Sequence, residues 1–586
     1  MSGEGSGRRH VAVVTGGGGG IGAAIAEELG RGGWFVVTVD PLVTLDGTTK
    51  LPEPEGTTAG RIVAAGGAAR ASAASVTDGE AVRRLFEELV AEHGGLDAVV
   101  NVAGITRQTG FAHGTEEDWL AVLTVHLQGY LNVLEAALPL MVAAGRGTVL
   151  GVTSGSGWRP ADAGAYSCAK RVVASLAWQL GRLMPPGVTV NAMSPIAATR
   201  MVAAALERAR QASRGARTGS GGGLSLTGMA GPEHLGPLGA YLVGEQFRWC
   251  TGRVVFAGGS ELAMVDEPRL LEVVRTDGVR SLSRVLGAVI PRALAAAETA
   301  QVSTGGTNPR FGPIFDEPDE PGGPRSDEPR SDEDGGRDAS EATTVRSCVV
   351  VSDRAALAAG LVETLEGRGF VCHRLGMTAG FEGAGSALRS LADEVGPVDA
   401  VVLAPAARPG DEGAGSHEEW PATWAGVLAQ HAHIVDDLYA DAAWARATAD
   451  YAGAVERPVR LVTVTDATTA AGRSRAQAAV QLARVAPATT EGRVSAFGVS
   501  METPADTEDK AAGPVVAELV VQLLDNPEAA PLAGAELVVG DGWVGLRSHP
   551  RPMGSITYGG PSLPQWLDAT VREIVGGPSH TTPEAP

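Results

Sequence analysis

Apolar and polar positions alternate along the first 265 residues in the order that an α/β fold requires. Short apolar runs, among them Val11–Val14 and Trp34–Val39, predict buried strands. Between these runs lie segments with helical periodicity, such as Ala23–Leu29 and Glu80–His93. Strands that alternate with amphipathic helices are typical of a doubly wound parallel sheet, so we predict this fold class.

The same pattern recurs after residue 345. Asp97–Gly104 is matched by Asp399–Ala406, and Val13–Gly16 is matched by Val350–Asp353. Repetition of a whole strand–helix series predicts a second domain of the same architecture.

Composition separates the two predicted domains. Residues 303–344 are rich in Asp, Glu, Gly, Pro and Ser, and such a segment cannot bury enough apolar surface to fold. We therefore predict a first domain (1–265), a helical extension (266–302), a disordered acidic linker (303–344), a second domain (345–550) and a tail (551–586). The tail contains one predicted helix, Gln565–Val575, and we expect it to wrap over a neighbour.

Charge and cysteine content exclude several classes of function. The formal net charge of −21 argues against a general affinity for nucleic acid or for anionic membranes. The four cysteines are far apart, which argues against a disulfide framework or a zinc site. The polar first residues do not resemble a signal peptide, and no apolar run reaches the about 20 residues of a membrane helix. We expect a soluble, cytoplasmic protein with no metal.

A glycine-rich loop, Thr15–Gly22, joins the first predicted strand to the first predicted helix. This context is the one that a dinucleotide-binding loop requires. Gly16 permits the tight turn, Gly20 lets the backbone approach a pyrophosphate, and Gly22 allows close helix packing. The alternative is a merely flexible loop.

Asp40 ends the second predicted strand, about 20 residues beyond the loop, where an acid bonds the adenine ribose hydroxyls. A carboxylate there repels a 2′-phosphate, so we expect NAD(H) rather than NADP(H). The alternative is that Asp40 only opens a turn before Pro41. Residues 41–60 are predicted to be a surface insertion before a helix at Ile62–Gly67.

Tyr166 and Lys170 are four residues apart, which places both side chains on one face of a helix. A nearby ammonium lowers the pKa of a phenol, as a general acid/base needs. Ser154 follows the apolar run Thr148–Val152. Thr153 and Ser156 are alternative hydroxyls, and we prefer Ser154 because Thr-Ser-Gly-Ser-Gly places it at the strand end.

Together, the glycine loop, Asn101-Val-Ala-Gly104, Ser154 and Tyr166-x-x-x-Lys170 resemble the short-chain dehydrogenase/reductase family over roughly Arg9–Val265. The resemblance implies a Rossmann-type sheet of about seven strands that binds a nicotinamide cofactor. The cofactor-binding positions that it implies are Thr15, Gly16, Gly20, Ile21, Gly22, Asp40, Val76, Asn101, Ala103, Gly104, Tyr166, Lys170, Pro195 and Thr199. It also implies that Tyr166 is the acid/base, Ser154 holds the substrate oxygen, and Lys170 binds the nicotinamide ribose.

Three positions depart from the family pattern. Ser75 stands where the family has an acid near the adenine, and Ile196 replaces a glycine beside the nicotinamide pocket. His126 replaces the asparagine of a proton relay. Histidine also carries protons, so His126 is either a relay or only a packed helix residue.

Thr199–Leu235 is the expected substrate lid, helical at first and then rich in Gly and Ser. Five arginines in this segment either receive an anionic handle, such as a CoA phosphate, or form a solvated helix face: Arg200, Arg208, Arg210, Arg214 and Arg217.

The second domain repeats the architecture without the chemistry. Asp353-Arg-Ala-Ala replaces the glycine loop, and Arg473-Ser-Arg-Ala-Gln lies where Tyr-x-x-x-Lys is expected. We predict a degenerate domain that takes the place of a partner subunit, so that a homodimer resembles a tetramer. The alternative is that it binds a different ligand.

The predicted function is NAD(H)-dependent interconversion of a secondary alcohol and a ketone, with a steroid-like, terpenoid-like or 3-hydroxyacyl substrate. Two alternatives stay open. One is a 3-oxoacyl-thioester reductase of lipid metabolism, and the other is a non-catalytic NAD-binding scaffold or sensor.

Overall fold

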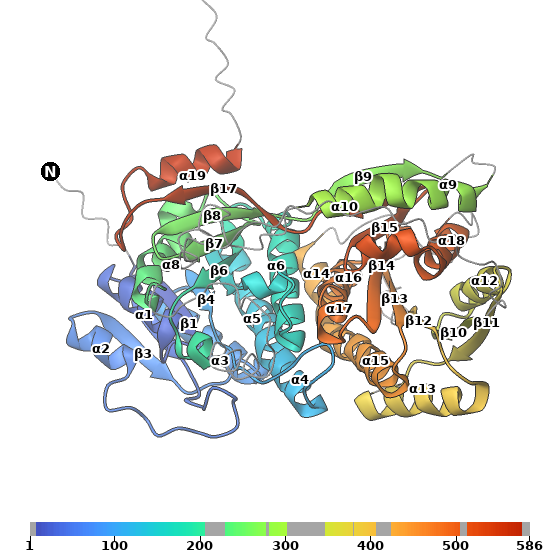
Figure 1. The fold of residues 1–586 in the computed structure, drawn as a ribbon. Coiled ribbons are helices and arrows are strands. Elements are labelled where there is room, and N and C mark those ends of the chain that lie inside the picture. The colour runs from blue at the N-terminus through green and yellow to red at the C-terminus, as the bar shows by residue number, and fades with distance from the viewer. Residues whose placement is uncertain are drawn as a thin grey trace, which may run out of the picture.

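The computed structural model of the 586-residue chain describes residues 8–204, 229–276, 281–301, 346–378, 380–405, 423–503 and 512–576. Most of the predicted lid (205–228) and the predicted acidic linker (303–344) lie outside the described residues. The described chain forms two α/β domains that lie side by side (Figure 1). We call residues 8–266 the first half and residues 346–547 the second half.

The first half is built on a nine-stranded sheet with the order β17-β8-β7-β6-β5-β4-β1-β2-β3. The strands are β1 (Val11–Thr15), β2 (Phe35–Val39), β3 (Ala68–Ser72), β4 (Ala98–Asn101), β5 (Gly147–Val152), β6 (Val188–Ile196), β7 (Val254–Gly258), β8 (Glu261–Asp266) and β17 (Arg551–Thr557). β1 to β7 pair in parallel, as the apolar runs predict. The expected number of seven strands was too low, because the antiparallel strands β8 and β17 extend the edge beyond β7.

Helices of the first half connect the parallel strands. They are α1 (Gly20–Arg31), α2 (Thr58–Ala64), α3 (Gly79–His93), α4 (Glu116–Leu123), α5 (Gly129–Ala144), α6 (Gly164–Gly181) and α8 (Gly236–Val243). The predicted bounds of α2 were wrong by about one turn. The Thr57 side chain accepts a hydrogen bond from the backbone N–H of Gly60 and starts the helix before Ile62.

The second half repeats this plan on an eight-stranded sheet with the order β11-β10-β12-β13-β14-β15-β16-β9. Its strands are β10 (Arg346–Val351), β11 (Phe370–Leu375), β12 (Ala400–Leu403), β13 (Val459–Asp466), β14 (Val494–Met501), β15 (Glu536–Gly540), β16 (Trp543–Arg547) and β9 (Leu270–Arg275). Its helices are α12 (Ala355–Glu366), α13 (Phe381–Val395), α14 (Trp424–Gln430), α15 (Ile434–Val455), α16 (Ala470–Ala483), α17 (Ala486–Thr489) and α18 (Ala512–Asp525). The predicted duplication of the fold is confirmed.

The two halves exchange edge strands (Figure 1). β9 leaves the first half and pairs with β16, whereas β17 leaves the second half and pairs with β8. The extension after residue 266 therefore begins as a strand, and only later forms helices α9 (Leu282–Val289) and α10 (Ala296–Ala300), contrary to the all-helical prediction. Each exchanged strand covers an edge with unpaired backbone groups, which is the physical reason for the difference.

The tail wraps over the first half of its own chain. After β17, helix α19 (Leu567–Gly576) lies on the first half, where Asp568 accepts hydrogen bonds from Tyr241 (2.9 Å) and Trp249 (3.0 Å). The predicted helix is therefore present within two residues of its expected bounds, and the neighbour that it covers is intramolecular.

Helix α6 packs against α16 between the two sheets (Figure 1). Tyr166 is the one residue of α6 that is not buried. A helix that is buried on all sides needs cover on its outer face, and the second half supplies that cover here. At this interface Ser474 donates to Ser175 (2.9 Å) and accepts from Gln179 (3.1 Å).

Among the described residues, one helical stretch, Glu116–Ala144, is long and apolar enough to cross a membrane by length and composition alone. Of its most apolar window, 61% is buried inside the protein. Core helices of compact domains pass the same test, so this stretch is explained by the packing of the first half.

Candidate active site

The glycine loop packs directly onto the end of β4. Gly16 has a φ of +64°, and a Cβ atom there would lie 2.9 Å from the backbone nitrogen of Ala103. The Thr15 hydroxyl donates to the side chain of Asn101 (2.7 Å) and accepts from the N–H of Ala103 (3.2 Å). A Cβ atom on Gly22 would collide with the carbonyl oxygen of Gly16. These contacts explain the glycines and hold the start of α1 open toward a ligand.

Asp40 lies beside this loop at the end of β2. Its carboxylate accepts hydrogen bonds from the backbone N–H groups of Gly18 (3.1 Å) and Leu42 (2.9 Å). Asp40 therefore does open the turn after β2, and it also lines the cavity described next.

A cavity of about 790 Å³ runs from the glycine loop to the N-terminal turns of α6. Most of the predicted site residues line it: Gly16, Gly20, Ile21, Asp40, Val76, Ala103, Gly104, His126, Ser154, Tyr166, Lys170, Pro195 and Thr199. Thr15, Gly22 and Asn101 do not line the cavity, and they support the residues that do. The structure thus brings together side chains from the ends of five different strands, as expected at the carboxyl edge of a parallel sheet.

Ser154 and Tyr166 both line this cavity, and the Ser154 hydroxyl faces the phenol and lowers its pKa. Ser154 begins the short 3₁₀ turn Gly155–Gly157, and its hydroxyl accepts a hydrogen bond from the N–H of Ser156 (3.3 Å). Thr153 is buried and donates its hydroxyl to the carbonyl oxygen of Lys170 (2.5 Å). The hydroxyl that faces Tyr166 is therefore that of Ser154.

Lys170 is buried beside Tyr166. Its Nζ donates to the carbonyl oxygen of Val152 (2.6 Å) and lies 5.7 Å from the centre of the Tyr166 ring. Burial lowers the pKa of Lys170 to about 7. Burial also raises the pKa of Tyr166, and the group that opposes this rise is Ser154 rather than Lys170, to which the sequence analysis had given that role.

His126 lies in a π-helical turn, Thr124–Gln128, and its ring meets that of Tyr166 edge-on at 5.0 Å. Its Nε2 is 2.7 Å from the carbonyl oxygen of Ile105, and its Nδ1 has no hydrogen-bond partner among the described residues. Burial, followed by the charge of Lys170, lowers the pKa of His126 to about 3. The ring is therefore neutral near pH 7, which favours the packed residue over an imidazolium relay.

Comparisons with known proteins agree with this geometry. The family model for short chain dehydrogenases matches residues 10–210. Nodulation protein G of Azospirillum brasilense is 30% identical over 256 residues, which is 43% of this chain and 97% of that protein. Short-chain reductase protein NovJ of Streptomyces niveus is 32% identical over 258 residues, which is 43% of this chain and 94% of that protein. The chain belongs to the short-chain dehydrogenase family.

A third relative is the 3-oxoacyl-(acyl-carrier-protein) reductase FabG of Staphylococcus aureus. It is 33% identical over 187 residues, which is 31% of this chain and 72% of that protein. All three alignments cover less than half of this short-chain dehydrogenase. The first half is therefore an oxidoreductase domain of the family.

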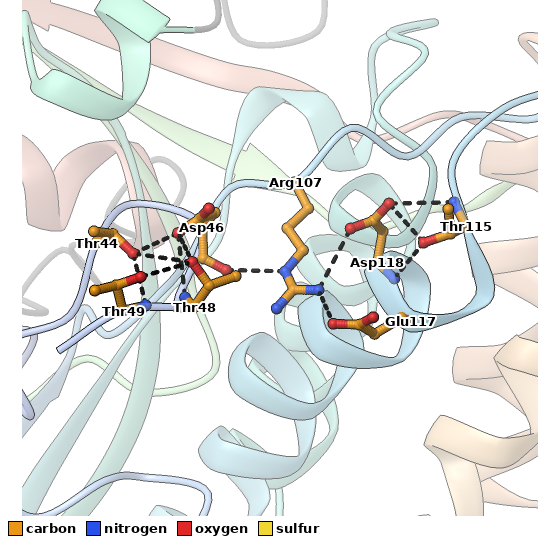
Figure 2. A network of polar contacts seen from close by, with 8 residues as sticks. All are labelled: Thr44, Asp46, Thr48, Thr49, Arg107, Thr115, Glu117 and Asp118. Carbon is orange, nitrogen blue, oxygen red and sulfur yellow. Dashed lines mark hydrogen bonds and ion pairs between the residues drawn. The ribbon is translucent and has the colours of Figure 1, made fainter.

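The insertion after Asp40 is more than a surface segment in this family member. Leu42, Val43, Leu45 and Leu51 line the cavity. Figure 2 shows how the insertion is held: Arg107 donates to the carbonyl oxygen of Asp46 (2.9 Å) and pairs with Glu117 (3.0 Å) at the start of α4. Apolar residues spaced along an otherwise polar stretch were the signal that the sequence analysis missed.

Arg200 also lies in a different place from the one that the sequence predicted. It was grouped with the substrate-lid arginines, of which the other four lie outside the described residues. Its guanidinium lies 3.7 Å from the position that a Cβ atom would have on Gly19. Arg200 therefore faces the glycine loop at the start of α1.

The corresponding place in the second half is closed by an ion pair. Arg354, just before α12, pairs with Asp466 at the end of β13 (3.0 Å), and both side chains are at least 86% buried. β13 is the counterpart of β5, because β13 pairs with β12 and β12 with β10, just as β5 pairs with β4 and β4 with β1. In the second half, a guanidinium–carboxylate pair thus joins the loop and the strand end whose counterparts in the first half enclose the cavity.

Proposed function

We propose that the first half catalyses reversible hydride transfer between NAD(H) and a secondary alcohol/ketone pair. The observation that carries the proposal is that the Ser154 hydroxyl faces the Tyr166 phenol, with Lys170 beside it, at one end of the cavity that begins at the glycine loop. A site that only bound a dinucleotide would need neither an acid/base nor a hydroxyl aimed at it.

The residues present fit a nicotinamide dinucleotide. A side chain on Gly16 would collide with the backbone of Ala103, and Gly20 has a φ of +57° that favours glycine. The start of α1 offers N–H groups and the positive end of a helix dipole to phosphates. Arg200 adds a positive charge on the other side of the loop. Asp40 supplies a carboxylate for ribose hydroxyls and disfavours a 2′-phosphate, which supports NAD(H) over NADP(H).

The bound cofactor supplies or accepts the hydride, and the chain's own residues manage the proton. During alcohol oxidation, Tyr166 removes the hydroxyl proton, and Ser154 donates a hydrogen bond to the substrate oxygen as its charge develops. Lys170 holds the cofactor ribose. Reduction of the ketone runs through the same groups in reverse.

The second candidate is reduction of a 3-oxoacyl thioester. The names of two relatives favour reduction, since one is a short-chain reductase and the other a 3-oxoacyl reductase. The proton chemistry is the same for both candidates, and only the substrate differs.

For the second half, we propose a non-catalytic role. The Arg354–Asp466 pair fills the place of a cofactor, and α16 carries no tyrosine or lysine. Packing of α16 on α6 supports a domain that takes the position of a partner subunit. A homodimer of the whole chain and a cytoplasmic location belong to the same proposal.

A screen of the purified full chain tests the main proposal. NADH formation is measured with steroid, terpenoid and 3-hydroxyacyl-CoA alcohols, using NAD⁺ and NADP⁺ in parallel. We expect turnover with NAD⁺, and we expect Tyr166→Phe to abolish it while NADH still binds. Unchanged turnover in Tyr166→Phe would refute the assignment of the acid/base.

A further inference from the structure

The loop between Ser154 and Tyr166 is held in place by the second half. Gln481, near the end of α16, donates its side-chain amide to the carbonyl oxygens of Ser156 (3.0 Å) and Arg159. Arg484, the C-cap of α16, donates to the carbonyl oxygen of Trp158. Three carbonyl oxygens within residues 156–159 thus accept from two side chains that come from more than 320 residues away in the sequence.

Both donors come from the interface between the two halves. Gln481 is 3% exposed, so its amide has little access to water as a replacement partner. Burial lowers the pKa of Arg484 to about 10, which still leaves it charged at neutral pH. The accepting carbonyl oxygens are partly buried, and that of Arg159 also accepts from the N–H of Ala161 (2.7 Å), so the loss of Gln481 bears mainly on Ser156.

The held turn acts directly on the Ser154 hydroxyl. Ser156 accepts from Gln481 through its carbonyl oxygen and donates its own N–H to Ser154 Oγ (3.3 Å). Gly157, the next residue, lies so close to α6 that a Cβ atom on it would be 2.9 Å from the backbone nitrogen of Arg171. The turn is therefore confined between α16 and the backbone of α6 next to Lys170.

We propose that Gln481 is a positioning residue for the active site, acting through Ser156 to hold the Ser154 hydroxyl on Tyr166. This inference rests on the proposed function. It assigns to the second half a task that could not be predicted from its sequence, which lacks the glycine loop and the Tyr-x-x-x-Lys motif at the corresponding places. Arg484 supports the same loop at Trp158 and keeps the indole buried.

The interface offers a matched control. Gln179 on α6 is also buried, at 4% exposure, and it also bonds across the interface, to Ser474 (3.1 Å) and the carbonyl oxygen of Ala470 (3.2 Å). It does not touch the loop. Gln179→Met and Gln481→Met each remove one buried amide from the same helix pair, and only the second releases Ser156.

The test compares the two variants in the full chain. For Gln481→Met we expect kcat to fall about 10- to 100-fold, because small displacements of an aligned group are costly, with the Kd of NADH within about twofold. The acidic limb of the kcat/KM profile for alcohol oxidation should move to higher pH, since Ser154 is the group that opposes the rise in the pKa of Tyr166. Gln179→Met should lower thermal stability by a similar amount and leave kcat within about twofold.

Equal kcat in the two variants would overturn the inference. If Gln481→Met does not fold, Gln481→Glu keeps the side-chain size, removes the donor and is held to the same comparison. Hydrogen exchange of residues 154–160 gives a readout that needs no turnover: it should quicken in the Gln481 variant only, and equal exchange in both variants would also overturn the inference. Turnover by Tyr166→Phe would instead contradict the proposed function, so the two failures are distinguishable.

Discussion

The hydroxyl of Thr153 donates a hydrogen bond to the carbonyl oxygen of Lys170 at 2.5 Å, and the hydroxyl of the next residue, Ser154, faces Tyr166. Adjacent hydroxyls at the end of β5 thus have different partners. Strand alternation turns consecutive side chains to opposite sides, so one of the two hydroxyls faces the cavity and the other packs under α6.

This difference predicts opposite effects for two small substitutions. Ser154→Ala should lower kcat about 100-fold or more, because it removes a donor aimed at the developing charge. Thr153→Val should lower the free energy of unfolding by about 1 kcal/mol and keep most of the turnover. Steady-state kinetics and urea denaturation of both variants check the prediction. Loss of activity in Thr153→Val with Ser154→Ala tolerated would exchange the two roles.

Burial of Lys170 predicts a pH-dependent stability in the ligand-free protein. Its pKa is about 7 in the folded chain, below the value near 10.4 of an exposed lysine, so the unfolded chain binds the extra proton between these values. The free energy of unfolding should therefore rise with pH from about 7 to about 10, by up to about 1.4 kcal/mol per unit from this group. Urea denaturation at pH 7, 8 and 9 should show this rise in the wild type relative to Lys170→Met. Parallel curves for the two proteins would contradict the prediction.

Asp40 should control the choice between the two nicotinamide cofactors. The backbone N–H groups of Gly18 and Leu42 bond different oxygens of Asp40, so Asp40→Asn keeps an oxygen for one of them and removes the charge. We expect the Kd of NADH to rise about tenfold and the Kd of NADPH to fall, since a 2′-phosphate is no longer repelled. Fluorescence titration with both cofactors measures the change. Asp46→Asn, in the same insertion, is the control because the Asp46 side chain bonds the turn around Thr44 and Thr48, and its bond to Arg107 is made by the backbone carbonyl oxygen.

The strand exchange predicts that the first half does not stand alone. A fragment ending at residue 265 lacks β17 and exposes the outer face of α6, including Cys168 and Ser175, which are otherwise buried against α16. We expect this fragment to aggregate or to lose cooperative thermal unfolding, because a bare sheet edge and an apolar helix face become exposed. A soluble monomeric fragment with the melting temperature of the full chain would contradict this expectation. Thermal scanning with size-exclusion chromatography provides the comparison.

The sequence by itself determined the site residues that depend on local structure. A strand, a glycine loop and a helix follow one another without interruption, so the roles of Gly16 and Gly22 were predictable from their spacing. Tyr166 and Lys170 are one helical turn apart, so their neighbourhood was predictable as well. The end of an apolar run pointed to Ser154 with Thr153 and Ser156 as alternatives, and the contact of Thr153 with Lys170 distinguishes Thr153 from Ser154.

Tertiary structure alone decided the contacts between segments that are distant in the chain. β9 pairs with β16 and β17 pairs with β8, although each pair is separated by more than 260 residues, and sheet edges carry no sequence mark of their partner. The insertion after Asp40 is held at the cavity by Arg107 and by the N–H of Thr106, which donates to the carbonyl oxygen of Leu45 (2.7 Å). Gln481 reaches Ser156 only because α16 packs on α6, so periodicity placed both residues in secondary structure while long-range packing brought them together.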